Sequence, residues 1–419
     1  MHKIGIFRLT AGAVLLASLF VIFMQIEPRT ATAAVESPAS NPLTEDWTGP
    51  YGGIPPFDKV KIADFKPAFE TAMAVNLKEI DAIANNKARP TFANTFVPLE
   101  ESGQMLARVN IIFGIWATNM NSPEFAPVQA EMGPKLAAHY DKIVQNGALF
   151  KRIEAVNNSP AKKKLTAEQQ RLVKVYYENF VHAGAKLDTA TKEEVSKLNQ
   201  ELASLFAKFN QNLQGEEGEL YVLIDNDSQL SGLPQSLKDA AAADAASKGK
   251  NGWMIRNTRS STDPFLTYAD DRGLREKVWK MFVSRGDNND TRDNKAIITQ
   301  ILKLRATRAK LFGFPTHAHW ILEQKMAKTP DNAMKLMEAF WPAAIGRVHE
   351  EVADMQKLAD AEGKGVKIEP WDYHYYMEKV RKEKYDLDQN EVKPYLQLDK
   401  MREAMFWVAG ELFGLGFKK

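Results

Sequence analysis

Apolar residues recur at the spacing of an α-helix along most of the chain after residue 57, and this periodicity most constrains its fold. Apolar side chains at i, i+3, i+4 and i+7 place one stripe of a helix toward a core. The longest example follows Thr191, and its members are Val195, Leu198, Leu202, Leu205, Phe206, Phe209 and Leu213. The sequence therefore predicts a mainly α fold.

Capping residues predict where two of these helices begin. Thr166 and Gln169 have the spacing of a capping box, in which each side chain satisfies a free backbone N–H of the first turn. Thr329 is a candidate N-cap, and Pro330 suits the first helical position because it needs no hydrogen-bond donor there. We expect Ala333, Met334, Met337 and Phe340 to form the apolar face of the second helix.

One region departs from the helical pattern. Residues 219–224 are rich in β-forming side chains and a turn follows them. Further strand candidates are 253–255 and 265–268, with an alanine-rich helical stretch at 237–246 between the strands. We predict a small strand-containing insert at 219–268, between a helical amino-terminal domain at 57–218 and a block at 269–419.

The first 34 residues have the pattern of an export signal. Lys3 and Arg8 precede an apolar run at 9–26, and an A-x-A-like site ends at Ala33 or Ala34. The alternative is an uncleaved anchor, because the apolar run approaches membrane-spanning length. We expect cleavage and a periplasmic or otherwise exported protein. Residues 35–56, rich in Pro, Gly, Ser and Thr, are predicted to be a linker.

Composition excludes several classes of function. The chain has no cysteine, which removes disulfides, thiolate metal sites and cysteine nucleophiles. Residues 1–34 contain three of the 55 basic and one of the 53 acidic residues, so 52 of each remain after cleavage. This balance does not suggest nucleic acid or an anionic membrane as a partner. No second apolar stretch is long enough to span a bilayer, so no membrane association is expected after signal removal.

Three ordered groups of segments carry a resemblance to a known family. The first begins with DFKPAF at 64–69 and continues at 79–84, 90–95 and 99–103; the second is 304–306, GFPTHAHW at 313–320 and 326–330; the third is 370–372, 375–376 and VKPY at 392–395. Together they resemble the thimet oligopeptidase and peptidyl-dipeptidase family of zinc metallopeptidases, the bacterial peptidyl-dipeptidase branch in particular. The resemblance covers almost all of the chain after the signal.

The resemblance implies a helical two-lobed clam-shell with a deep channel, zinc in the complete enzyme, and short peptides as substrates. It also implies that 269–419 is the start of the catalytic metallopeptidase domain, incomplete here. On this basis the chain is expected to be the amino-terminal portion of an exported zinc metallopeptidase, which in its complete form hydrolyses short peptides and releases carboxy-terminal dipeptides.

The zinc-binding motif of such peptidases does not occur in the chain. H-E-x-x-H places two histidines on one helix face, with a glutamate beside them as general base. The nearest segment is 349–353, where Ala353 stands at the position of the second histidine. A polar helix surface is the simpler interpretation of this segment. We therefore assign no catalytic and no metal-binding residue, and we expect the chain alone to bind no zinc and to be inactive.

Two other segments suggest metal ligands superficially. His317 and His319 would point about 200° apart on a helix, so they could share an ion only on a strand. Residues 287–293 are rich in Asp and Asn, but an EF-hand loop would need Gly at Arg292 and Glu at Ile298. Packing or solvent exposure for the histidines, and a turn with a helix cap for 287–293, are favoured.

The aromatic segment 371–376 supplies the candidate substrate-binding residues. Trp371, Asp372, Tyr375 and Tyr376 could line a wall of the substrate channel, where phenol hydroxyls can bond a peptide backbone. The alternative is that these aromatic side chains pack the core and their hydroxyls bond partners within it.

A different class of function is a non-catalytic helical module that binds peptides or a partner protein. A further candidate partner is a second chain that carries the missing catalytic half. An amphipathic helix is predicted at 401–417, with an apolar face that would need a cover. Its large apolar members include Met405, Phe406, Val408, Leu412 and Phe413.

Overall fold

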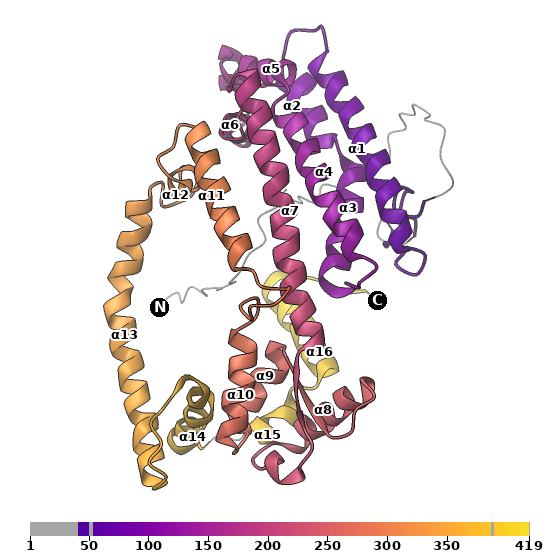
Figure 1. Ribbon diagram of the computed structural model, residues 1–419. Coiled ribbons are helices and arrows are strands. Elements are labelled where there is room, and N and C mark those ends of the chain that lie inside the picture. The colour runs from indigo at the N-terminus through magenta and orange to yellow at the C-terminus, as the bar shows by residue number, and fades with distance from the viewer. Residues whose placement is uncertain (1–40, 50–52, 387–388, 419) are drawn as a thin grey trace. The chain divides into compact units, whose positions relative to one another are not determined.

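The computed structural model describes residues 41–49, 53–386 and 389–418 (Figure 1). Residues 42–419 form one compact unit. The expected signal and its cleavage residues Ala33 and Ala34 lie outside the described residues. Helices dominate the described chain and its two strands form one small sheet, which confirms the mainly α fold. In the part of the chain that the structure describes, no helix is long and apolar enough to cross a membrane.

Among the described residues, the amino-terminal block contains seven α-helices and a short 3₁₀ turn. They are α1 (Ile62–Ala84), α2 (Phe92–Glu101), α3 (Gln104–Asn119), α4 (Ala126–Val144), α5 (Gly147–Asn157), η2 (Pro160–Lys164), α6 (Ala167–His182) and α7 (Thr189–Glu219). The capping box is confirmed at the start of α6, where Thr166 Oγ1 accepts from Gln169 N at 3.2 Å and Gln169 Oε1 accepts from Thr166 N at 3.2 Å. The long helix α7 packs along α4 (Figure 1).

Two apolar clusters form the core of this block. One joins α1, α3 and α4 around Phe65, Phe69 and Phe113, and the other joins α1, α2, α5 and α6 around Phe96 and Ile153. The rings of Phe69 and Phe113 meet edge to face with centroids 5.0 Å apart, a favourable arrangement of aromatic quadrupoles.

The predicted linker is partly built into this core. It has no helix or strand in its described residues, as expected, but Leu43 is 1% exposed within the first cluster and Trp47 packs against that cluster. Burial of Leu43 and partial burial of Trp47 make the segment around them part of the folded block rather than a spacer.

The strand-containing region holds a two-stranded antiparallel sheet. Strands β1 (Tyr221–Ile224) and β2 (Trp253–Arg256) pair from Tyr221 opposite Arg256 to Ile224 opposite Trp253. The other elements are η3 (Asp227–Leu230), α8 (Gln235–Ser247), α9 (Arg259–Tyr268) and α10 (Arg272–Val283). The strand predicted at 265–268 is wrong: these residues end α9, and a short apolar run does not distinguish a strand from a buried helix turn. Their core also continues beyond residue 268, to Ala269 and to Val278 on α10.

The remaining elements follow α10. They are α11 (Lys295–Leu311), α12 (His317–Leu322), α13 (Pro330–Ala361), η4 (Pro370–Asp372), α14 (Tyr373–Tyr385), α15 (Gln389–Val392), η5 (Lys393–Tyr395) and α16 (Leu398–Phe413). The predicted start of α13 is confirmed, since Thr329 Oγ1 accepts from Asn332 N at 3.2 Å and Pro330 is the first helical residue. Its expected core face is exposed, and Phe340 for example is 67% exposed.

Candidate functional site

The aromatic segment 371–376 lies where η4 passes into α14. Pro370 begins η4, and the carboxylate of Asp372 accepts a hydrogen bond from Glu369 N at 3.2 Å, which fixes the turn. α14 then packs against α9 and α13, and η4 packs against α10. The segment is thus positioned by elements on both sides of it in the sequence.

Two arginines of α10 bind the buried carboxylate of Asp372. Arg272 donates from Nη2 to Oδ2 at 2.8 Å and from Nε to Oδ1 at 3.1 Å, and Arg275 donates from Nη2 to Oδ1 at 2.8 Å. Arg272 is partly exposed, whereas Arg275 and Asp372 are almost completely buried. Burial alone would raise the pKa of Asp372, but the hydrogen bonds from the two arginines outweigh it and hold that pKa below its ordinary value.

The two buried tyrosines of α14 also bond to carboxylates. Tyr375 donates its hydroxyl to Asp270 Oδ1 at 2.8 Å, and Tyr376 donates to Glu362 Oε2 at 3.2 Å. Burial first, and the bond to Asp270 among further causes, raise the pKa of Tyr375. Each hydroxyl therefore stays neutral near pH 7 and has a partner inside the fold.

Trp371 is the one of the four candidate residues that reaches the surface. Asp372, Tyr375 and Tyr376 are buried, while Trp371 is half-buried. Its ring meets Trp279 at 5.7 Å and lies under the cations of Arg272 and Lys280, both at 5.7 Å from the centroid. The three buried side chains hold α9, α10, α13 and α14 together in this structure. A substrate-channel role remains a prediction, and exposure favours Trp371 for it.

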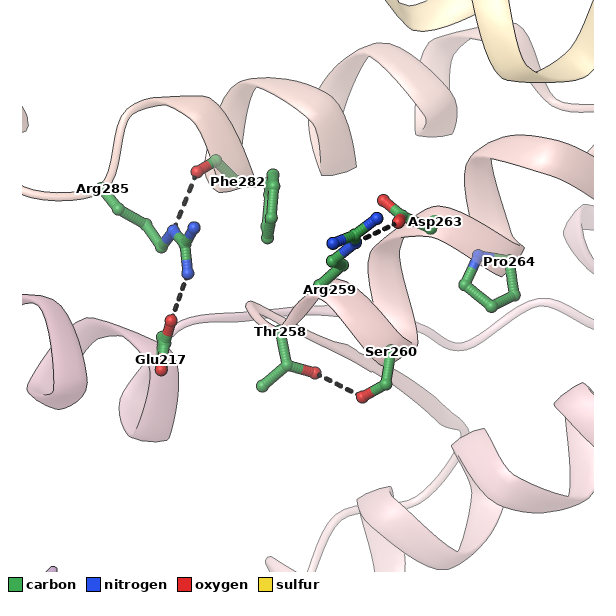
Figure 2. A pocket seen from close by; sticks show the side chains of 8 residues that line it. All are labelled: Glu217, Thr258, Arg259, Ser260, Asp263, Pro264, Phe282 and Arg285. Carbon is green, nitrogen blue, oxygen red and sulfur yellow. Dashed lines mark hydrogen bonds and ion pairs between the residues drawn. The ribbon is translucent and has the colours of Figure 1, made fainter. Parts of the chain in front are cut away.

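A separate hollow of about 760 Å³ lies between the end of α7, the start of α9 and the end of α10 (Figure 2). Arg285 bonds Glu217 and the carbonyl of Phe282, and Arg259 bonds Asp263 at 3.0 Å. The lining holds two acidic and two basic side chains, so its formal charges cancel, and the hydroxyls of Thr258 and Ser260 bond each other at 3.3 Å. The hollow offers hydroxyls and paired charges, which suit hydrogen bonding rather than acid–base chemistry.

The histidine segments show no shared metal geometry. His317 and His319 lie two residues apart on α12, and His319 Nδ1 bonds Thr316 Oγ1 at 2.8 Å. His349 is exposed on α13, and its neighbours Glu350 and Glu351 pair with Arg347 at 3.1 Å each. Among the described residues, no three His, Asp or Glu side chains converge in a way that could hold a metal ion.

The Asp- and Asn-rich loop at 287–293 closes around a lysine. Lys295 Nζ bonds Asp287, Asn289 and Asp293, the last at 2.6 Å. Asp293 also accepts from Lys295 N at 2.9 Å at the start of α11. The turn is confirmed, and Asp293 bonds the first backbone N–H of α11 from the position before the N-cap residue Asn294, which makes no side-chain cap of its own.

Sequence reasoning missed Arg272, Arg275 and Asp270 as partners of the aromatic segment. The spacing of Arg272 and Arg275 places both on one side of α10, which is a local signal. Their shared carboxylate is about a hundred residues away in the chain, and no local pattern indicates that pairing.

The sequence profile described as "Peptidase family M3" matches residues 265–419. A protein described as "Dipeptidyl carboxypeptidase" from Escherichia coli (strain K12) is 37% identical over 379 residues, which is 90% of this chain and 56% of that relative. The chain belongs to peptidase family M3. The expected family is thereby confirmed.

Two further relatives match over a similar span. "Organellar oligopeptidase A, chloroplastic/mitochondrial" from Arabidopsis thaliana is 30% identical over 91% of this chain and 48% of its own length. "Oligopeptidase A" from Escherichia coli (strain K12) is 25% identical over 87% of this chain and 54% of its own length. The chain thus spans about half the length of the curated relatives it matches.

Proposed function

We propose that this chain is part of a zinc metallopeptidase that hydrolyses short peptides and releases carboxy-terminal dipeptides. The observation that carries the proposal is the match over 90% of the chain to a relative described as a dipeptidyl carboxypeptidase, at 37% identity. The relatives described as oligopeptidase A match at 25–30% identity, which favours the dipeptide-releasing branch.

The described residues of this chain do not fit a zinc site. A catalytic zinc needs three protein ligands with an open fourth position. The described residues bring no such set together, and the sequence contains no H-E-x-x-H. We propose that the metal ligands and the general base lie in polypeptide beyond these residues, on a longer form of the protein or on a second chain. This chain would then supply scaffold and peptide contacts.

We propose further that the protein is exported. The support is the basic start, apolar run and small residues of 1–34. An exported peptidase of this kind would act on peptides outside the cytoplasm.

The test compares the chain alone with a fusion. The chain is joined to the part of the Escherichia coli dipeptidyl carboxypeptidase that it does not match, and both proteins are assayed with zinc on a short peptide with a free carboxyl end. We expect chelator-sensitive release of dipeptides from the fusion and none from the chain alone.

A control peptide distinguishes dipeptide release from internal cleavage, and one result would contradict the proposal. The same peptide with an amidated end should be a poor substrate if dipeptides are removed from the carboxyl end, and internal cleavage products would favour oligopeptidase activity instead. Chelator-sensitive hydrolysis by the chain alone, free of contaminating peptidases, would contradict the assignment of the catalytic residues to other polypeptide.

A further inference from the structure

The middle of α13 has no cover among the described residues. α12 contacts its beginning and α14 packs against its end (Figure 1). Residues 334–350 between them are all exposed. A large apolar stripe runs along this stretch, and we call it the α13 stripe. Its members are Met334, Met337, Trp341, Ile345 and Val348.

The same stripe is buried where α14 reaches it. Steps of three and four residues continue the stripe from Val348 through Val352 to Met355 and Ala359. Met355 and Ala359 are almost completely buried, in a cluster with Tyr375 and Tyr376 of α14. This face of α13 is therefore suited to burial against other polypeptide. α14 covers only its last part.

A second stripe of this kind lies on α16. Met401, Met405, Val408 and Leu412 recur at helical spacing and are all exposed, and no residue of α16 is buried. We call these four residues the α16 stripe. The ring of Phe406 stacks on the ring of Phe417, with centroids 4.1 Å apart. Phe417 therefore covers Phe406 and not the four residues of the α16 stripe.

Leaving these stripes in water is costly. Full burial of one large apolar side chain stabilises a fold by about 1.5–3 kcal/mol, and the two stripes leave nine such side chains exposed. Large contiguous apolar surfaces mark interfaces with other polypeptide. By contrast, the two clusters of the amino-terminal block are closed.

We propose that the α13 and α16 stripes form the docking surface for a polypeptide homologous to the part of the M3 relatives that this chain does not match. Both stripes lie within residues 265–419, the stretch that matches the family profile. The relatives that match this chain carry about half of their own length in addition. This polypeptide is the one that the proposed function requires for the metal ligands, so the inference rests on that proposal.

Hydrogen exchange on the full chain and on the fusion described above tests this surface. In a dilute monomer of the chain alone, we expect backbone amides of 334–348 to exchange at least tenfold faster than those of the buried part of α7. In the fusion, we expect exchange across 334–348 and 401–412 to slow at least tenfold, because a covered helix opens less often.

Variants identify the stripe as the cause. In the fusion, Trp341→Asp should restore fast exchange across 334–348, since it places a charge at the centre of the interface. The matched control Ile111→Asp changes an apolar residue of α3 that is exposed to a similar extent, and it should leave exchange in α13 unchanged.

The outcomes separate this inference from the proposed function. A fusion that releases dipeptides while 334–348 still exchanges fast would overturn the docking surface and leave the function standing. Slowed exchange across 334–348 in a fusion that releases no dipeptides would support the docking surface and contradict the proposed function. Protection of 334–348 in the dilute chain alone, or protection that appears together with the mass of a dimer, would also overturn the inference, because the chain or a second copy would then provide the cover.

Discussion

His182 and Trp320 bind each other through two hydrogen bonds and a ring stack. His182 Nε2 donates to the carbonyl of Trp320 at 2.7 Å, and Trp320 Nε1 donates to the carbonyl of His182 at 3.2 Å. Their rings are 4.7 Å apart and nearly parallel, and Phe312 stacks on Trp320 with centroids 5.3 Å apart. This contact ties the end of α6, in the amino-terminal block, to α12, in the segment that matches the family profile.

Trp320→Leu should weaken this connection. The change removes one hydrogen-bond donor and most of the stacked surface, so we expect the free energy of unfolding to fall by about 2–3 kcal/mol. Urea denaturation measures the loss, and hydrogen exchange should locate it in α12. Trp407→Leu is the matched control, because Trp407 is 66% exposed on α16 and should change stability by less than about 0.5 kcal/mol. Equal losses in the two variants would contradict a specific role for the pair.

Asp372→Asn should be strongly destabilising. It leaves the buried guanidinium of Arg275 without its carboxylate, and breaking one partner of a buried ion pair costs about 3–5 kcal/mol. Asp399→Asn is the control, since Asp399 pairs with Arg402 at the surface and such pairs contribute about 1 kcal/mol or less. Chemical denaturation of both variants decides the matter: a loss at Asp372 no larger than at Asp399 would rule out the buried pair as a main tie between α10 and η4.

His317 predicts a pH dependence on the acid side of neutrality. Burial first, then the charges of Arg305 and Arg308, lower the pKa of His317 to about 4. An unfolded histidine titrates near 6.5, so the unfolded chain takes up its proton first as the pH falls. Stability from the neutral ring is therefore complete above about pH 6.5 and declines toward pH 4. The urea midpoint of His317→Gln, measured from pH 7 to pH 4, should fall less than that of the unchanged chain.

Local patterns were sufficient for much of the fold. Thr166 and Thr329 begin helices as predicted, because a cap depends on residues three positions apart. Residues 265–268 were misassigned because a run this short fits a strand and a helix equally well. The apolar face of α13 was identified by its spacing, but spacing does not tell whether the chain itself supplies the cover.

The candidate site was harder to predict, because it depends on contacts between segments that are distant in the chain. The sequence singled out Trp371, Asp372, Tyr375 and Tyr376 as a cluster, but their burial depends on partners far away in the chain. The guanidinium of Arg275 reaches Asp372 only when α10 packs on η4. Such long-range pairing is set by tertiary packing, which single-sequence patterns do not encode.

The amino terminus of the exported protein is a direct test of the signal. Cleavage after Ala33 or Ala34 should give a mature chain that begins at Ala34 or Val35. Mass spectrometry of the intact protein from a periplasmic fraction measures this. An intact Met1 recovered with membranes would show that the apolar run is an uncleaved anchor.

The amino-terminal block should fold without the rest of the chain. Both of its apolar clusters consist of residues between Leu43 and Ala185, so a fragment of 42–218 keeps every buried member of each. We expect cooperative unfolding by circular dichroism, with fraying only near Asn212 and Glu216, which bond Asn294 and Gly286 in the full chain. A matched fragment of 57–218 lacks the buried Leu43, and deleting a buried leucine costs about 2–5 kcal/mol. The shorter fragment should therefore be less stable by at least about 2 kcal/mol, and equal stability of the two would show that the segment before residue 57 is only a spacer.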